Sequence, residues 1–137
     1  MLAKESTQMD ILELQQSVKH LKVLYVEDDP TINQQFAAFL KEFFEHVDSA
    51  YNGQEGLEKF SQNTYDVVIT DIQMPKLNGW DMLESMHGLK SEVFYCVLSA
   101  TDLEIPLHSH YDVIMPKPMT LEGLFSMVEL IRKKYNI

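Results

Sequence analysis

The sequence of 137 residues predicts an α/β fold in which a doubly wound, five-stranded parallel sheet is covered by helices on both faces. Short apolar runs rich in β-branched residues alternate with longer segments of helical period from residue 22 onward. The runs are apolar throughout, which is typical of strands buried on both faces of a parallel sheet. Strands that alternate with helices along a chain of this length indicate one layered α/β domain.

An N-terminal extension precedes the first expected strand. In residues 1–20, apolar side chains from Met9 onward are spaced loosely like those of one helix. We expect a short helix packed on the surface of the domain, which would itself comprise residues 21–137. A signalling or dimerising helix is the alternative, and only the apolar stripe supports it.

Five strands are expected, at residues 23–26, 47–50, 67–70, 93–98 and 113–115. The second is the weakest, because its sequence, VDSA, holds only one β-branched residue. Apolar side chains at helical spacing follow the first, second, third and fifth strands, and the last helix carries Leu121 to Ile131. Between the fourth and fifth strands, Pro106 would interrupt a helix.

Composition and charge restrict the classes of function. The net charge of −10 argues against a nucleic-acid surface, which needs clustered Lys and Arg. The single cysteine, Cys96, lies in an apolar run and is expected to be a buried thiol. No apolar stretch approaches the roughly 20 residues that span a bilayer, and acidic residues interrupt the N-terminus where a secretory signal has an apolar core. We therefore expect a cytoplasmic protein with no membrane insertion and no direct nucleic-acid binding.

Polar residues follow four of the expected strands. Glu27 and Asp28 follow the first strand, Asp71 the third and Ser99 the fourth, and Lys117 comes soon after the fifth. Parallel strands end at the same edge of a sheet, and doubly wound proteins bind their ligands there. We therefore expect these five side chains to converge on one crevice.

Such a crevice suits phosphoryl chemistry. Three neighbouring carboxylates repel one another, and a hard divalent cation such as Mg²⁺, which prefers oxygen ligands, removes that repulsion. A carboxylate can also attack phosphorus to form an aspartyl phosphate, provided that positive charge screens the phosphoryl oxygens. Lys117 offers a compact positive charge, and Ser99 offers a hydrogen-bond donor.

Four motifs, VLYVEDDP, DVVITDIQMPKLNG, VLSA and PKP, stand in this order, each at the end of its expected strand. Through them residues 21–135 resemble the receiver domains of two-component response regulators. The resemblance implies a flavodoxin-like strand order, 2-1-3-4-5. It also implies a phosphorylation-dependent signalling switch rather than an enzyme, with only Mg²⁺-assisted self-phosphorylation and slow autodephosphorylation. The fourth helix, between Ser99 and Lys117, is about one turn shorter than in the family, so we expect it to be short, distorted or replaced by a loop.

The resemblance assigns roles to the residues of the crevice. Asp71 is implied as the phosphoacceptor, with Ser99 as the switch hydroxyl and Lys117 as the lysine that contacts the phosphoryl group. Glu27, Asp28 and Asp71 are implied as ligands of Mg²⁺, for which Mn²⁺ or Ca²⁺ can substitute.

Further details of the site follow from the same resemblance. The backbone carbonyl of Gln73 is implied as another Mg²⁺ ligand, and the Lys117–Pro118 bond as a cis peptide. Asp29 is read as an ordinary helix cap. The family's switch aromatic, three residues before the lysine, is replaced by Ile114, while Tyr111 lies on the opposite strand face by period-two counting.

Other functions fit the sequence less well. A flavodoxin-like electron carrier needs a phosphate-cradling loop after the first strand, where this chain has acidic residues. A phosphohydrolase often carries a second Asp two residues after its nucleophile, and Gln73 stands there instead. A pseudo-receiver that acts only by binding would be expected to lose part of the acid–lysine set, which is complete here. His108, His110 and Asp112 faintly suggest a metal site, but an exposed polar loop is favoured, and His87 is expected at the surface.

The partners follow from the same interpretation. We expect a sensor histidine kinase or a phosphotransfer protein to supply the phosphoryl group from a phosphohistidine. The added charge of about −1.5 to −2 would bias a two-state surface that a downstream protein or effector domain reads. Homodimer formation is left open.

Overall fold

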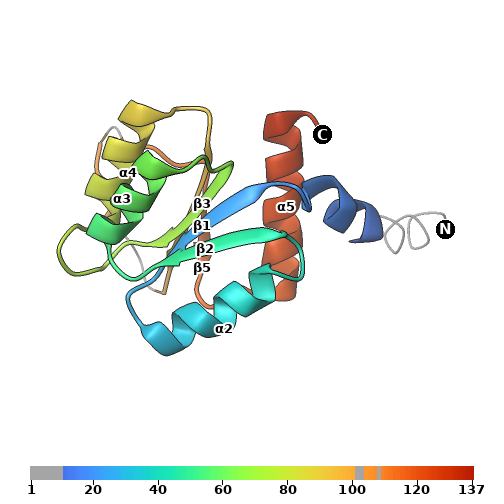
Figure 1. Cartoon of the computed structure of the whole chain (residues 1–137), viewed down its shortest axis with the longest axis horizontal. Coiled ribbons are helices and arrows are strands. Elements are labelled where there is room, and N and C mark those ends of the chain that lie inside the picture. Colours follow the sequence, from blue (N-terminus) through green and yellow to red (C-terminus); the bar gives the residue numbers. More distant parts are fainter. Residues whose placement is uncertain (1–10, 101–103, 108) are drawn as a thin grey trace.

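The structure is a computed structural model that describes residues 11–100, 104–107 and 109–137. Its sheet is parallel, with the strand order β2-β1-β3-β4-β5 (Figure 1). The strands are β1 (Lys22–Val26), β2 (His46–Ala50), β3 (Val67–Asp71), β4 (Phe94–Ser99) and β5 (Val113–Pro116). The predicted fold class and strand order are confirmed, and each strand lies within two residues of its predicted bounds.

Two pairs of helices cover the two faces of the sheet. They are α2 (Pro30–Leu40) with α5 (Leu121–Tyr135), and α3 (Gly53–Gln62) with α4 (Gly79–Leu89). A hydrophobic core lies between the sheet and the helices on each face. Alternate residues of β1 belong to different cores: Tyr25 packs with α2 and α5, whereas Leu24 packs with α3 and α4. The residues of β1, β3 and β4 that are buried on both faces are apolar apart from Thr70, and the other polar residues lie at the strand ends.

The helices begin where side chains can satisfy their first backbone N–H groups. Asn52, Asn78 and Thr120 each accept a hydrogen bond from the backbone N–H three residues ahead, at the starts of α3, α4 and α5. Asp29 does the same for α2 through the N–H of Ile32, which confirms its reading as a cap. No helix in the described parts of the chain is long and apolar enough to cross a membrane.

A helical segment precedes β1. Residues 11–18 are helical, and Leu14 and Val18 are buried in the core that α2 and α5 share. Because Lys22 starts β1 soon afterwards, the segment lies at the edge of the sheet where the parallel strands begin. The burial of two apolar side chains favours the packed helix over a free signalling helix.

The connection between β4 and β5 has no helix in its described residues, 104–107 and 109–112. The expectation of a shortened, distorted or replaced fourth helix is thereby met within these residues, while residues 101–103 and 108 lie outside the description. Residues 104–107 are exposed, and Leu107 is 89% exposed. Within the described residues, the backbone N–H of Ser109 donates to the carbonyl of Pro106 at 3.3 Å.

Candidate functional site

The predicted site residues meet at the edge where the strands end. Glu27 directly follows β1, Asp71 is the last residue of β3, and Ser99 is the last residue of β4. The parallel register places Ser99 opposite Pro116 of β5, and the backbone N–H of Lys117 donates to the Ser99 carbonyl at 2.8 Å. Four neighbouring strands thus deliver these residues to one place, as the sequence predicted.

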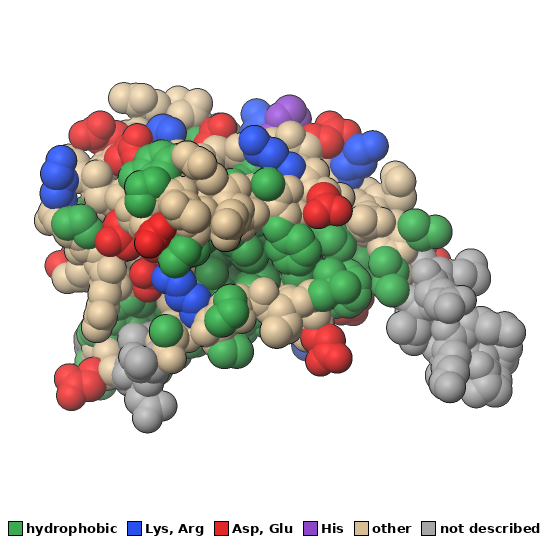
Figure 2. Space-filling model, turned by 90° about the horizontal axis from the view of Figure 1, so that it is seen from below, with side chains coloured by type: hydrophobic (Ala, Val, Ile, Leu, Met, Phe, Trp, Pro, Cys, Tyr) green, Lys and Arg blue, Asp and Glu red, His purple; other side chains and the backbone are tan. Residues whose placement is uncertain are grey.

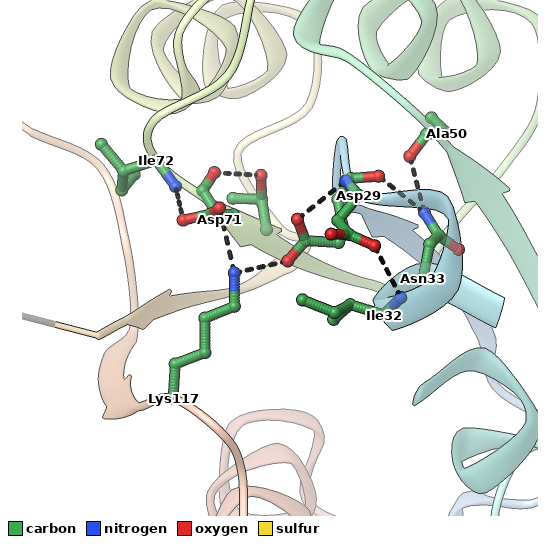
Figure 3. Close-up of polar contacts among 9 residues, drawn as sticks. Asp29, Ile32, Asn33, Ala50, Asp71, Ile72 and Lys117 are labelled. Carbon is green, nitrogen blue, oxygen red and sulfur yellow. Dashed lines mark hydrogen bonds and ion pairs between the residues drawn. The ribbon is translucent and has the colours of Figure 1, made fainter. Parts of the chain in front are cut away.

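Lys117 lies at the centre of the polar contacts. Its Nζ donates to Glu27 Oε1 at 2.5 Å and to Asp71 Oδ2 at 3.1 Å (Figure 3). The second oxygen of Glu27 accepts the backbone N–H of Asp29 at 3.1 Å. Glu27 is only 2% exposed, so its charge is withdrawn from water and depends on these contacts.

Burial and mutual attraction both shift the pKa values of Glu27 and Lys117. Burial raises the pKa of Glu27 above its ordinary value, although hydrogen bonding and attraction from Lys117 act in the opposite direction. Burial alone would lower the pKa of Lys117, but the carboxylates of Glu27 and Asp71 outweigh it and raise that pKa. Lys117 is therefore held in its charged form beside the phosphoacceptor candidate.

Three carboxylates form a cluster that fits a divalent cation. One oxygen each from Glu27, Asp28 and Asp71 lies within 4.8 Å of the others. Asp28 and Asp71 are half-buried, whereas Glu27 is buried. Hard oxygen donors at this spacing are the ligands that Mg²⁺ takes in proteins.

The acidic loop after β1 is fixed by a residue that the sequence analysis did not single out. Asn33 of α2 is fully buried, and its Nδ2 donates to the carbonyl of Glu27 at 2.9 Å and to that of Ala50 at 3.0 Å (Figure 3). The two bonds tie the ends of β1 and β2 together beneath the cluster. In the sequence, Asn33 could have been noticed as an amide on the apolar face of the predicted helix, three residues before Phe36 and seven before Leu40.

A tight loop follows Asp71. The backbone N–H of Ile72 donates to Asp71 Oδ1 at 2.7 Å, and the N–H of Gly79 donates to the Ile72 carbonyl at 2.8 Å. A Cβ on Gly79 would lie 2.6 Å from the Asp71 carbonyl oxygen, so only glycine allows this approach. Lys76 adopts a positive φ of 71° at the turn. The loop therefore fixes one carboxylate oxygen of Asp71 and leaves the other facing Lys117.

A family model, described as the response regulator receiver domain, matches residues 23–129. The chain belongs to the response regulator receiver family. Its match covers β1 from its second residue, the other four strands in full, and every residue of the site described above.

Curated relatives agree with this family. The chain is 38% identical over 112 residues to the uncharacterized transcriptional regulatory protein YcbL of Bacillus subtilis, covering 78% of this chain and 46% of that protein. It is 30% identical over 117 residues to the regulatory protein VanRB of Enterococcus faecalis, covering 83% and 53%. The receiver domain thus spans about half the length of these relatives.

Solved structures show the same fold. The N-terminal domain of an uncharacterized protein from Wolinella succinogenes aligns with a TM-score of 0.75 at 31% identity, covering 85% of this chain and 97% of that one. The response regulator TrrA from Thermotoga maritima, solved with Mg²⁺ and BeF, aligns with a TM-score of 0.73 at 28% identity, covering 81% and 98%. Receiver domains are signalling domains rather than enzymes, and they bind Mg²⁺ at an acidic pocket.

Several finer expectations of this receiver domain can be compared with the structure. The Lys117–Pro118 peptide is cis, as predicted. Cys96 is buried, and burial raises its pKa to about 12. Ser99 is half-buried at the end of β4, and Gln73 is exposed in the loop after Asp71. Ile114, in the place of the family's aromatic residue, is half-buried against the core of α3 and α4.

Two expectations for the histidines need comment. Asp112 pairs with Lys134 at 3.0 Å rather than with imidazoles, and no cluster that includes His110 is found among the described residues as a metal site. His87 is not a simple surface residue, because it is half-buried and its ring stacks on that of His110. His108 lies outside the described residues.

A hydrophobic groove adjoins the site. It has a volume of about 570 Å³ and lies between α2 and the segment that follows β5, and it is lined by Phe36, Phe39 and Met119 and also by Lys117. Figure 2 shows hydrophobic side chains gathered in a hollow on this face, with a basic group next to acidic groups at one end. The groove brings an apolar surface directly to the reactive residues.

Proposed function

We propose that this receiver domain is a phosphorylation-dependent switch in which Asp71 accepts a phosphoryl group. The observation that carries the proposal is the position of Asp71 at the end of β3, in contact with Lys117 and within a cluster of carboxylates. The phosphoryl donor would be a phosphohistidine on a sensor histidine kinase or a phosphotransfer protein. A downstream protein or effector domain would read the result, in the cytoplasm.

The transfer would follow from the contacts of Asp71. Because Oδ1 already accepts the N–H of Ile72, we assign Oδ2 as the oxygen that attacks phosphorus. The new P–O bond forms as the P–N bond to the donor histidine breaks, and the electron pair leaves with the imidazole. Lys117, at 3.1 Å from Oδ2, would then face the phosphoryl oxygens and offset their charge.

Glu27, Asp28, Asp71 and the backbone carbonyl of Gln73 would hold Mg²⁺. When bound, the cation supplies charge screening between these carboxylates and the phosphoryl oxygens. In this arrangement Glu27 uses both oxygens, one for Lys117 and one for the N–H of Asp29. Each carboxylate oxygen has a second lone pair, so Glu27 could help to hold the cation while it keeps these contacts, and Asp28 and Asp71 are less buried than Glu27.

The signal would leave the site through the segment after β4. Ser99 is the last residue of β4, and its carbonyl is bonded to the N–H of Lys117, so an inward pull on either residue affects both loops. The hydroxyl of Ser99 would donate to a phosphoryl oxygen. Phosphorylation adds about −1.5 to −2 charge at neutral pH, which biases the two positions of these loops.

The groove is proposed as the docking site of the phosphodonor protein. An amphipathic helix of the partner would place apolar side chains against Phe36 and Phe39 and carry its phosphohistidine past Lys117 to Asp71. Continuity of the groove with the phosphoacceptor site supports this occupant, because the donor histidine must come within bonding distance of Asp71.

The phosphoacceptor is tested by mass. Wild-type protein incubated with acetyl phosphate and Mg²⁺ is expected to gain one phosphoryl group, and chelation of Mg²⁺ is expected to abolish the gain. Asp71→Asn should gain none, while Asp29→Asn, which changes only the helix cap, should behave as wild type. An adduct that survives in Asp71→Asn would disprove the assignment.

A further inference from the structure

Two ring contacts join residues 109–112, the segment before β5, to helix α4. The rings of His87 and His110 are parallel, with centroids 3.8 Å apart and planes 5° apart. The rings of Trp80 and Tyr111 meet at 6.0 Å with a tilt of 59°. Trp80 and His87 are seven residues apart, two turns along α4, so the adjacent residues His110 and Tyr111 contact one helix face at two separate points.

The two ring contacts belong to a connection whose described residues are mostly exposed. Residues 104–107 are exposed, and the described part of the connection contains no helix. Asp112 anchors its far end, where it accepts from the backbone N–H of Tyr95 at 2.8 Å and pairs with Lys134 at 3.0 Å. Within the described residues 104–107 and 109–111, His110 and Tyr111 make ring contacts to α4.

The stacked imidazoles respond to protons in a definite direction. Neutral rings stack favourably, and one charged ring can still lie against a neutral one. Two charged rings at 3.8 Å repel each other, and imidazole changes its charge between about pH 5 and 8. The stacked pair is therefore destabilised when both rings carry a charge, but not when only one does.

The charged groups around the pair do not remove this repulsion. Lys134 of α5 and Asp112 line the same small hollow, but they neutralise each other. Tyr95 of β4 also lines it, and burial raises its pKa far above neutrality, so it stays uncharged. On α4 itself, Glu84 and Lys90 lie about one turn to either side of His87, with opposite charges.

We propose that His87 and His110 form a proton-sensitive clasp that holds the segment before β5 on α4 and releases it when both rings are protonated. Release would separate Tyr111 from Trp80 and uncover the side of β5 that carries Ile114. The clasp does not depend on phosphorylation of Asp71.

Trp80 is the only tryptophan of the chain and reports on the clasp directly. In the full-length chain, quenching of its fluorescence by acrylamide is measured from about pH 8 to 5.5, the range in which imidazole is titrated. We expect a rise in quenching as the pH falls, and loss of this pH dependence in both His87→Gln and His110→Gln. His20→Gln and His46→Gln, which change exposed histidines, should keep the wild-type profile.

Two further measurements keep the test decisive. Far-ultraviolet circular dichroism at each pH verifies that every variant is folded, and Glu27→Gln, which removes the cluster acid whose pKa is raised, excludes titration of that acid as the source of the signal. A flat profile in the wild type would overturn the clasp. So would a pH-dependent profile that persists in either His87→Gln or His110→Gln.

Discussion

At the residue scale, the site holds a charge that is costly to bury. Glu27 is 2% exposed, and its raised pKa shows that the surroundings disfavour the carboxylate even with Lys117 in contact. A buried ion pair is weak evidence for stability, because well-packed apolar residues in place of both partners often stabilise a fold equally well. A buried acid with an ammonium partner and two neighbouring carboxylates is instead typical of a site that gains its compensating charge from a bound cation.

The pH dependence of Glu27 gives a first prediction. Because its pKa is higher in the folded than in the unfolded protein, the folded state binds protons more tightly, and the free energy of unfolding falls as the pH rises from about 4.5 through the raised pKa. Glu27→Gln resembles the protonated acid and should remove this loss. Urea unfolding without metal should therefore show the variant to be more stable at pH 7, with the advantage vanishing below about pH 4.5.

The exposed Glu84 provides a matched control for this measurement. The free energy of unfolding of Glu84→Gln should differ from that of the wild type by the same amount at every pH in this range. Added Mg²⁺ should stabilise the wild type by mass action and stabilise Glu27→Gln less. An unchanged pH profile in Glu27→Gln would show that the acid is not strained by burial.

At the element scale, the start of α3 supports the loop that carries Asp71. A Cβ on Gly53 would lie 2.0 Å from the carbonyl oxygen of Leu77, so Gly53→Ala must displace the loop between β3 and α4. We expect a loss of about 1–3 kcal/mol in the free energy of unfolding, as for other overpacked sites. Chemical denaturation measures the loss, and slower labelling by acetyl phosphate should accompany it.

Gly88 of α4 is the control for this substitution. A Cβ there would meet nothing within 4 Å, so Gly88→Ala should stabilise the helix by about 0.5–1 kcal/mol. Both variants add one methyl group to a helix, and only the contact with Leu77 differs. Equal effects of the two variants would contradict the supporting role of Gly53.

The docking groove is an element-scale feature with its own prediction. Ile32 of α2 is 41% exposed at the groove, so Ile32→Glu should fold but oppose an apolar partner helix. We expect slower phosphorylation by a phosphotransfer protein that labels the wild type, and an unchanged rate with acetyl phosphate. Equal slowing with both donors would place the defect in the reaction rather than in docking.

The strands and helices could be predicted because buried strands appear as short apolar runs and helices as apolar residues at helical spacing. The convergence of the site residues was also predictable, since parallel strands end at one edge: Asp71 and Ser99 end β3 and β4, and Glu27 and Lys117 directly follow β1 and β5. Asn33 was missed because its role depends on two carbonyls, at residues 27 and 50, that only the fold brings together. The stacking of His87 on His110 was likewise hidden, because a connection without a helix carries no periodic signal.

At the scale of the whole molecule, the candidate site and the N-terminal helical segment lie at opposite ends of the parallel strands. The acidic cluster occupies the edge where the strands end, while the helical residues 11–18 precede β1 at the opposite edge. The N-terminal segment contributes Leu14 and Val18 to the core of α2 and α5. Its contribution should therefore be to stability, with no direct effect on the chemistry of Asp71.

Substitutions in this segment separate packing from signalling. Leu14 is 5% exposed, and Leu14→Ala should lower the free energy of unfolding by about 2–5 kcal/mol. Leu12 is 66% exposed, and Leu12→Ala should change it by less than about 0.5 kcal/mol. Both variants should take up phosphate from acetyl phosphate at the wild-type rate under conditions in which they are folded. If beryllofluoride, a phosphoryl mimic, makes the wild type dimerise and Leu12→Ala abolishes the dimer, the segment is a signalling helix after all. A dimer that persists in Leu12→Ala, or its absence in both proteins, is the result that a packing role predicts.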